Sequence, residues 1–155
     1  MTGRNETQFL NVDLDIYSRS HLEPLVEALK GRPFIHYVGR ERGCYAAHIS
    51  LSSHGQTADA LIRNLGRLIK KLPKSARALW DSATSREFNV GIQSGYAPQS
   101  YEVRVNESTV VLLSELNASI VVTTYAAMER SRSNAALPKA QSQVTTLQRR
   151  RRERV

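Results

Sequence analysis

The sequence predicts an α+β fold in which a mostly antiparallel sheet is covered by helices on one face. In several segments apolar and polar residues alternate with period two, most clearly over residues 9–17, which is typical of half-buried strands. Between them lie segments with apolar residues at helical spacing, the clearest over 61–72. Strands outnumber the crossovers that a parallel sheet would need. The predicted order is β-α-β-β-α-α-β-β-α-β, and we expect a ferredoxin-like arrangement.

The first half of the chain predicts a helix and a hairpin after the strand at 9–17. Ser20 and Glu23 have the spacing of a capping box, and Gly31 can end the helix. Two further strands are expected at 34–38 and 45–51. The polar loop "GRERG" between them is an ordinary hairpin connection.

The second half predicts two helices and then three more strands with a helix among them. Thr57 is the expected N-cap of the helix that carries the 61–72 stripe, and Asp59 favours its first turn. Pro73 ends that helix, and a short helix follows. The remaining elements are strands at 87–93 and 100–105, a helix at 107–117 after Asn106, and a strand at 119–125.

Composition predicts one domain of 9–126 between a flexible N-terminus (1–8) and a basic, disordered tail (127–155). The chain has 155 residues, 41% of them apolar, and one cysteine, so we expect a cytoplasmic protein without disulfides or a membrane span. The formal net charge is +8, but residues 129–155 hold 8 of the 22 basic and only 2 of the 14 acidic residues. The basicity is therefore concentrated in the tail, and the domain is near neutral.

The segments "FLNVDLDIYS…LEPLVEAL", "TADALIRNLGRLIKKLPKSARALWDSA…FNVGIQ" and "LLSELNASIVVTTY" carry a resemblance. In hydrophobic pattern and element order, residues 9–126 resemble small uncharacterised bacterial proteins of an α+β family of unknown function. The resemblance implies an interaction module and brings no catalytic residues.

The stretch "HYVGRERGCYAAH" (36–48) raises two chemical hypotheses. Its glycines with Arg40 and Arg42 could bind phosphate, but no helix N-terminus or phosphate-loop pattern follows, so a hairpin turn is favoured. Cys44 and His48 share a strand face and could ligate a metal, yet residues four apart on a strand are about 13 Å apart. We therefore expect no metal and no cofactor.

The sheet face without helices is the candidate partner surface. Asp13 and Asp15 lie on that face of the first strand, and paired carboxylates can perform acid–base chemistry when their environments differ. Pairing with arginines across the strands on a solvated face is the favoured interpretation. The residues predicted to form the surface are Asp13, Asp15, Asn89, Gln93 and Arg104.

The arginine run "QRRRRERV" is the sharpest charge feature and the candidate polyanion-binding segment, through Arg149, Arg150, Arg151, Arg152 and Arg154. Such runs bind phosphate backbones without sequence preference; a solubilising tail is the alternative. No nucleophile with a base, metal set or phosphate loop is present, so we do not expect an enzyme. The sequence favours a non-catalytic module that binds a protein partner. Association with nucleic acid through the tail is the alternative, and the oligomeric state stays open.

Overall fold

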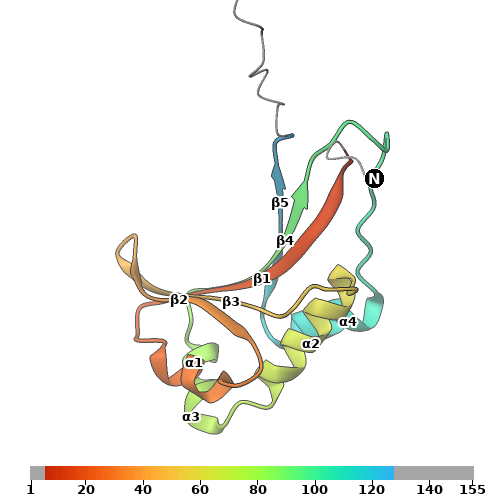
Figure 1. Cartoon of the computed structure of the whole chain (residues 1–155). Coiled ribbons are helices and arrows are strands. Elements are labelled where there is room, and N and C mark those ends of the chain that lie inside the picture. The colour runs from red at the N-terminus through yellow and green to blue at the C-terminus, as the bar shows by residue number, and fades with distance from the viewer. Residues whose placement is uncertain (1–5, 128–155) are drawn as a thin grey trace, which may run out of the picture.

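The computed structural model describes residues 6–127, which fold as a five-stranded sheet with four helices (Figure 1). The strands are β1 (Gln8–Ser18), β2 (Phe34–Glu41), β3 (Cys44–Ser50), β4 (Ser85–Gln93) and β5 (Ser119–Tyr125). The helices are α1 (Glu23–Leu29), α2 (Ala58–Lys70), α3 (Lys74–Asp81) and α4 (Glu107–Glu115). All four helices lie on the same side of the sheet, which confirms the α+β class with one covered face (Figure 1).

The strand order is β2-β3-β1-β4-β5, and the sheet is mixed. The first three pairings in this order are antiparallel, while β5 lies parallel to β4 after the crossover through α4. The prediction of a mostly antiparallel sheet was therefore wrong at this edge, because the connection through α4 returns the chain in the same direction. The predicted ferredoxin-like arrangement is not confirmed.

The strand predicted at 100–105 is also wrong, because the segment before α4 forms no strand. Both edges of β1 and of β4 are already paired, and the segment does not join the free edge of β2 or of β5. The segment instead packs as extended chain, held where the Phe9 N–H donates to the Tyr101 hydroxyl at 2.7 Å. Val103 and Val105 are half-buried against the core, which accounts for the alternation without a ladder.

The core lies between the helices and the covered face of the sheet. Along β1, Val12, Leu14 and Ile16 are fully buried on this face, as the alternation predicts. Phe88 and Val90 of β4 extend the same layer. The polar residues between them therefore project from the opposite face.

Helix starts follow the predicted chemistry in part. The Thr57 hydroxyl accepts the Ala60 N–H at 3.2 Å, so the N-cap of α2 is confirmed. The predicted capping box at Ser20 is wrong, because Leu22 is the N-cap of α1 and makes no side-chain cap. The Ser20 N–H is bound instead by the Ser18 hydroxyl.

Arg86 ties the end of α3 to the sheet and to the end of α4. Its guanidinium donates to the carbonyls of Trp80, Asp81 and Ala83 and, through Nε, to the carbonyl of Asn117. Helix C-terminal carbonyls lack partners within the helix, so a guanidinium satisfies them well. This bonding also directs Arg86 to the covered side of the sheet.

Candidate functional site

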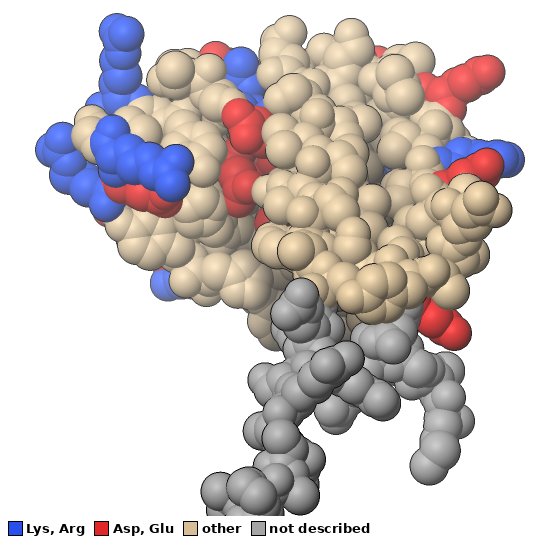
Figure 2. All heavy atoms as spheres, turned by 90° about the horizontal axis from the view of Figure 1, so that it is seen from above, with Lys and Arg blue, Asp and Glu red and all other residues tan. Residues whose placement is uncertain are grey.

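The sheet surface opposite the helices, called here the open face, carries a concentration of polar side chains. The open face is formed by alternate residues of the strands, since Asp13 and Asp15 lie opposite Ser50 and His48 on β3 and opposite Asn89 and Glu87 on β4. Figure 2 looks onto this face and shows acidic atoms in a recess, with most basic atoms at the periphery.

At the centre of the open face His48 bridges two carboxylates, and we call Asp15, Glu41 and His48 the His48 network. Nδ1 of His48 lies 2.7 Å from Asp15 Oδ1, and Nε2 lies 2.9 Å from Glu41 Oε2. The three residues come from β1, β2 and β3, so the imidazole links three strands. Two tyrosine rings stand beside it, Tyr17 edge-on at 5.9 Å and Tyr37 tilted at 5.7 Å between centroids.

The charges around His48 favour its protonated form. Partial burial lowers the pKa of His48, but the hydrogen bonds and negative charges of Asp15 and Glu41 outweigh it and raise the pKa above 6.5. An imidazolium donates from both nitrogens, as this geometry requires. Burial, with the charges of Asp15 and Glu41, also raises the pKa of Tyr17.

A chain of hydrogen bonds continues the network toward β5. The Thr123 hydroxyl donates to Asn89 Oδ1 at 2.8 Å, and Asn89 Nδ2 lies 3.4 Å from Asp15 Oδ2. Asp13 stands beside this chain, where its carboxylate accepts from Asn11 Nδ2 at 2.9 Å. Burial and the neighbouring charge of Asp15 raise the pKa of Asp13, although the Asn11 bond lowers it.

The structure brings together three of the five residues predicted for the partner surface. Asp13, Asp15 and Asn89 lie side by side on the open face. Gln93 lies at the end of β4, where its amide donates to the carbonyl of Ala126 at 2.7 Å. The predicted place of Arg104 was wrong, because its segment is not a strand and Arg104 lies beside α2, with Glu102 3.8 Å away.

Sequence reasoning missed His48 and Glu41 as members of this surface. The shared face of positions 44, 46, 48 and 50 was visible in the alternation of β3. The signal that was lacking is the pairing of β3 with β1, which sets His48 opposite Asp15. Glu41 reaches the same imidazole because the β2–β3 hairpin folds it back over β3.

The stretch 36–48 forms the predicted hairpin, with a tighter turn than the sequence indicated. β2 extends to Glu41 and β3 begins at Cys44, so only Arg42 and Gly43 form the turn, both with positive φ (48° and 87°). The two arginines diverge, since the Arg40 guanidinium lies over the Tyr45 ring while Arg42 lies near Glu41. They do not converge on a phosphate.

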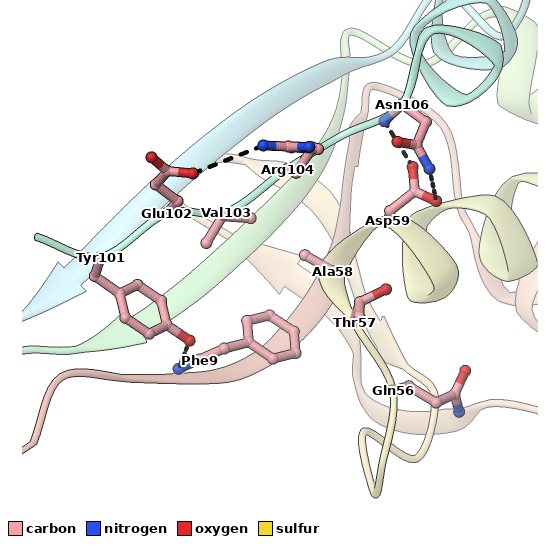
Figure 3. Close-up of a pocket in the computed structure, with 10 residues that line it drawn as sticks. All are labelled: Phe9, Gln56, Thr57, Ala58, Asp59, Tyr101, Glu102, Val103, Arg104 and Asn106. Atoms are coloured by element: carbon pink, nitrogen blue, oxygen red, sulfur yellow. Dashed lines mark hydrogen bonds and ion pairs between the residues drawn. The ribbon is translucent and has the colours of Figure 1, made fainter.

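A second hollow lies on the helix side, at the N-terminus of α2 (Figure 3). Asp59 lines it and accepts from the Asn106 N–H at 2.9 Å, the Asn106 amide at 3.0 Å and Arg63 at 2.8 Å. Burial raises the pKa of Asp59, but these hydrogen bonds and the charge of Arg63 outweigh burial, so the pKa lies below its usual value. The Asp59 carboxylate is occupied by the hydrogen bonds that hold Asn106 to α2. We therefore interpret the residues around the hollow as structural and not as a binding site.

No protein-family model, curated protein or solved structure matches this chain. The resemblance to a bacterial α+β family therefore stays a prediction. Within residues 6–127 there is no group of three or more His, Cys, Asp or Glu side chains arranged to hold a metal. None of the helices between Glu23 and Glu115 has the length and apolar content for a membrane crossing. The arginines at 149–152 and 154 lie outside the described residues.

Proposed function

We propose that the chain is a small, non-catalytic cytoplasmic module whose open face binds a positively charged segment of a protein partner. The observation that carries the proposal is the separation of charge across the sheet. Four carboxylates lie on the open face, at Asp13, Asp15, Glu41 and Glu87. A recess lined by carboxylates and tyrosines suits arginine or lysine side chains, through charge-assisted hydrogen bonds and cation–π contacts.

The basic residues of the strands support the same conclusion. The five strands contain two arginines, and both turn to the helix side, Arg86 toward helix-end carbonyls and Arg40 onto the ring of Tyr45. The Tyr45 hydroxyl lies 2.9 Å from Nε2 of His21, which precedes α1. Arg42, in the hairpin turn, is 89% exposed at the margin. The open face thus has an acidic centre, where four carboxylates surround one cationic imidazole, that of His48.

An acid–base role is less well supported by the same geometry. Both nitrogens of His48 face carboxylates at hydrogen-bond distance, so neither is directed at a substrate. Because Asp15 and Glu41 hold the proton on the ring, the network suits a fixed cationic bridge between strands. We therefore assign the His48 network the role of positioning the carboxylates of the face.

Nucleic-acid association remains the second candidate, carried by the arginine run at 149–154. Phosphate backbones would be repelled by the four carboxylates of the open face. The positive side chains of α2, of its C-cap residue and of α3 offer them another surface, on the opposite side of the molecule. These residues are Arg63, Arg67, Lys70, Lys71, Lys74 and Arg77.

The test uses the full chain with its five run arginines at 149–152 and 154 replaced by glutamine, so that the tail does not compete. Labelled octa-arginine is titrated while fluorescence anisotropy and amide NMR shifts are recorded. We expect shifts on the open face and about threefold to tenfold weaker binding for Asp13→Asn or Glu87→Gln. Asp81→Asn, the same charge change on α3, is the matched control and should leave the affinity unchanged.

Two results would contradict the proposal. In one, Asp81→Asn weakens binding as much as Asp13→Asn, which would mean that net charge alone attracts the peptide. In the other, the shifts gather on the helix side. Tighter binding of a DNA duplex than of octa-arginine by the wild-type chain, lost with the five arginines, would favour the second candidate instead.

A further inference from the structure

We propose that the arginine run at 149–154 of the same chain occupies the open face and competes there with the external partner. This inference rests on the proposed function, since it names a regulator of the same surface. A sheet face with an acidic recess and an arginine-rich segment in one chain have complementary charge. Joining them by a linker makes their contact intramolecular, with an effective concentration of order millimolar.

The open face offers carboxylates at a spacing that suits alternate arginines of an extended segment. Asp13 and Asp15 are two residues apart on β1, and Glu87 lies directly across from Asp15 on β4. Neighbours on one face of a strand are about 7 Å apart, which is also the spacing of alternate residues in an extended peptide. Two alternate arginines of an extended run along β1 would therefore meet Asp13 and Asp15, with Glu87 beside the second of them.

Two tyrosines give the recess a feature that distinguishes arginine from a generic cation. Tyr17 and Tyr37 flank His48, and Tyr37 is 39% exposed. A guanidinium stacks on aromatic rings more readily than an ammonium does and binds carboxylates in a bidentate manner. The run holds five arginines and no lysine, in keeping with this chemistry.

The length and starting point of the tail allow the contact. The described chain ends at Ala127, directly after β5, and residues 128–148 separate it from Arg149. A segment of that length spans at most roughly 70 Å. The path from the Gln93 end of β4, beside Tyr125, to Glu87 covers six residues, or about 20 Å along the strand. The run can therefore reach the whole recess.

The experiment places a nitroxide label beside the run in the full chain. Cys44→Ser removes the natural thiol, and Gln148→Cys carries the label. We expect broadening of the amide signals of Asp13, His48 and Thr123, and none for Arg67 or Lys71 on the outer side of α2. The broadening should disappear when the five arginines are replaced by glutamine, and at about 1 M salt, where the Debye length is roughly 3 Å.

Octa-arginine binding supplies the functional half of the test. Docking of the run predicts about tenfold weaker binding of the peptide to the wild-type chain than to the five-glutamine chain. Equal affinities, or no broadening on the open face, would overturn the inference. So would broadening that persists when labelled and isotope-enriched molecules are separate chains, because the run would then bind a second copy.

The two proposals fail in different ways. If octa-arginine binds the open face of the five-glutamine chain but the label produces no broadening, the surface binds cations and the intramolecular contact is wrong. If octa-arginine fails to bind the five-glutamine chain at all, the proposed function itself is wrong.

Discussion

Replacing His48 by glutamine tests whether the His48 network stabilises the fold as a protonated bridge. Side-chain exposure is 24% for His48, 13% for Asp15 and 32% for Glu41, so the three groups are mostly shielded from water. A hydrogen bond to a charged group contributes about 1.5–3 kcal/mol. Glutamine keeps a neutral donor for one carboxylate, and partial exposure weakens the Glu41 bond. We expect a loss of about 2–3 kcal/mol near pH 6.

The pH dependence gives this prediction its sign. The folded-state pKa of His48 is raised above 6.5, so the folded chain holds the proton more tightly than the unfolded chain does. The stability from the bridge is fully present below pH 6.5 and is lost as pH rises through the folded pKa. The difference in unfolding free energy between wild type and His48→Gln should therefore be largest near pH 6 and shrink as pH rises above 6.5.

Urea unfolding followed by tryptophan fluorescence measures both quantities, because the single Trp80 is fully buried. His36→Gln is the matched control. Among residues 6–127, His36 bonds only the Ser50 hydroxyl, so its replacement should cost less than about 1 kcal/mol. A gap between wild type and His48→Gln that stays constant or widens with rising pH would refute the protonated bridge.

Three further substitutions test other polar interactions by the same urea-unfolding assay. Asp59→Asn should lower the free energy of unfolding by about 2–3 kcal/mol, because an amide cannot accept all the hydrogen bonds that the Asp59 carboxylate accepts. Hydrogen exchange at the Asn106 amide should become faster. Unchanged exchange there would contradict this explanation. Arg86→Leu should lower the free energy of unfolding by about 2 kcal/mol, and Arg86→Lys by an intermediate amount. An equal loss for both variants would show that the stabilisation depends on the planar guanidinium and not on the positive charge. Asp13→Asn should raise the free energy of unfolding at pH 7 by less than about 1 kcal/mol, since burial and the charge of Asp15 raise the pKa of Asp13. The gain should vanish below pH 3.8, where the carboxyl is protonated in both states. A lower stability at pH 7 would contradict the raised pKa.

The sequence predicts which residues share a face of a strand, but it does not predict which strands lie next to one another in the sheet. Period-two alternation assigned Asp13 and Asp15 to one face of β1 and Asn89 to the same face of β4, because side-chain direction is a local property of extended chain. The pairing of His48 with Asp15 joins residues 33 positions apart. Register across such a separation depends on which edges are free, and alternation carries no information about edges.

Arg104 illustrates the same limit from the opposite side. Its segment alternates as a strand does, and pairing with a sheet edge would have placed Arg104 on the open face. Both edges of β1 and β4 are occupied, and the segment does not pair with the free edges of β2 or β5; it lies beside the first residues of α2 instead. As a result the open face lacks the expected arginine and is more acidic than the sequence indicated, which favours a positively charged partner.

Asp13 connects the stability of the domain with its proposed role. A carboxylate with a raised pKa opposes folding at neutral pH, and Asn11 is its one hydrogen-bond donor among the described residues. An asparagine would occupy the same volume at lower cost, so folding alone does not explain an aspartate at this position. A bound guanidinium would reverse the balance, because an opposite charge at close range lowers the pKa of a carboxyl. Asp13→Asn should therefore yield a chain that is more stable and binds octa-arginine more weakly, a combination that a purely structural aspartate would not produce.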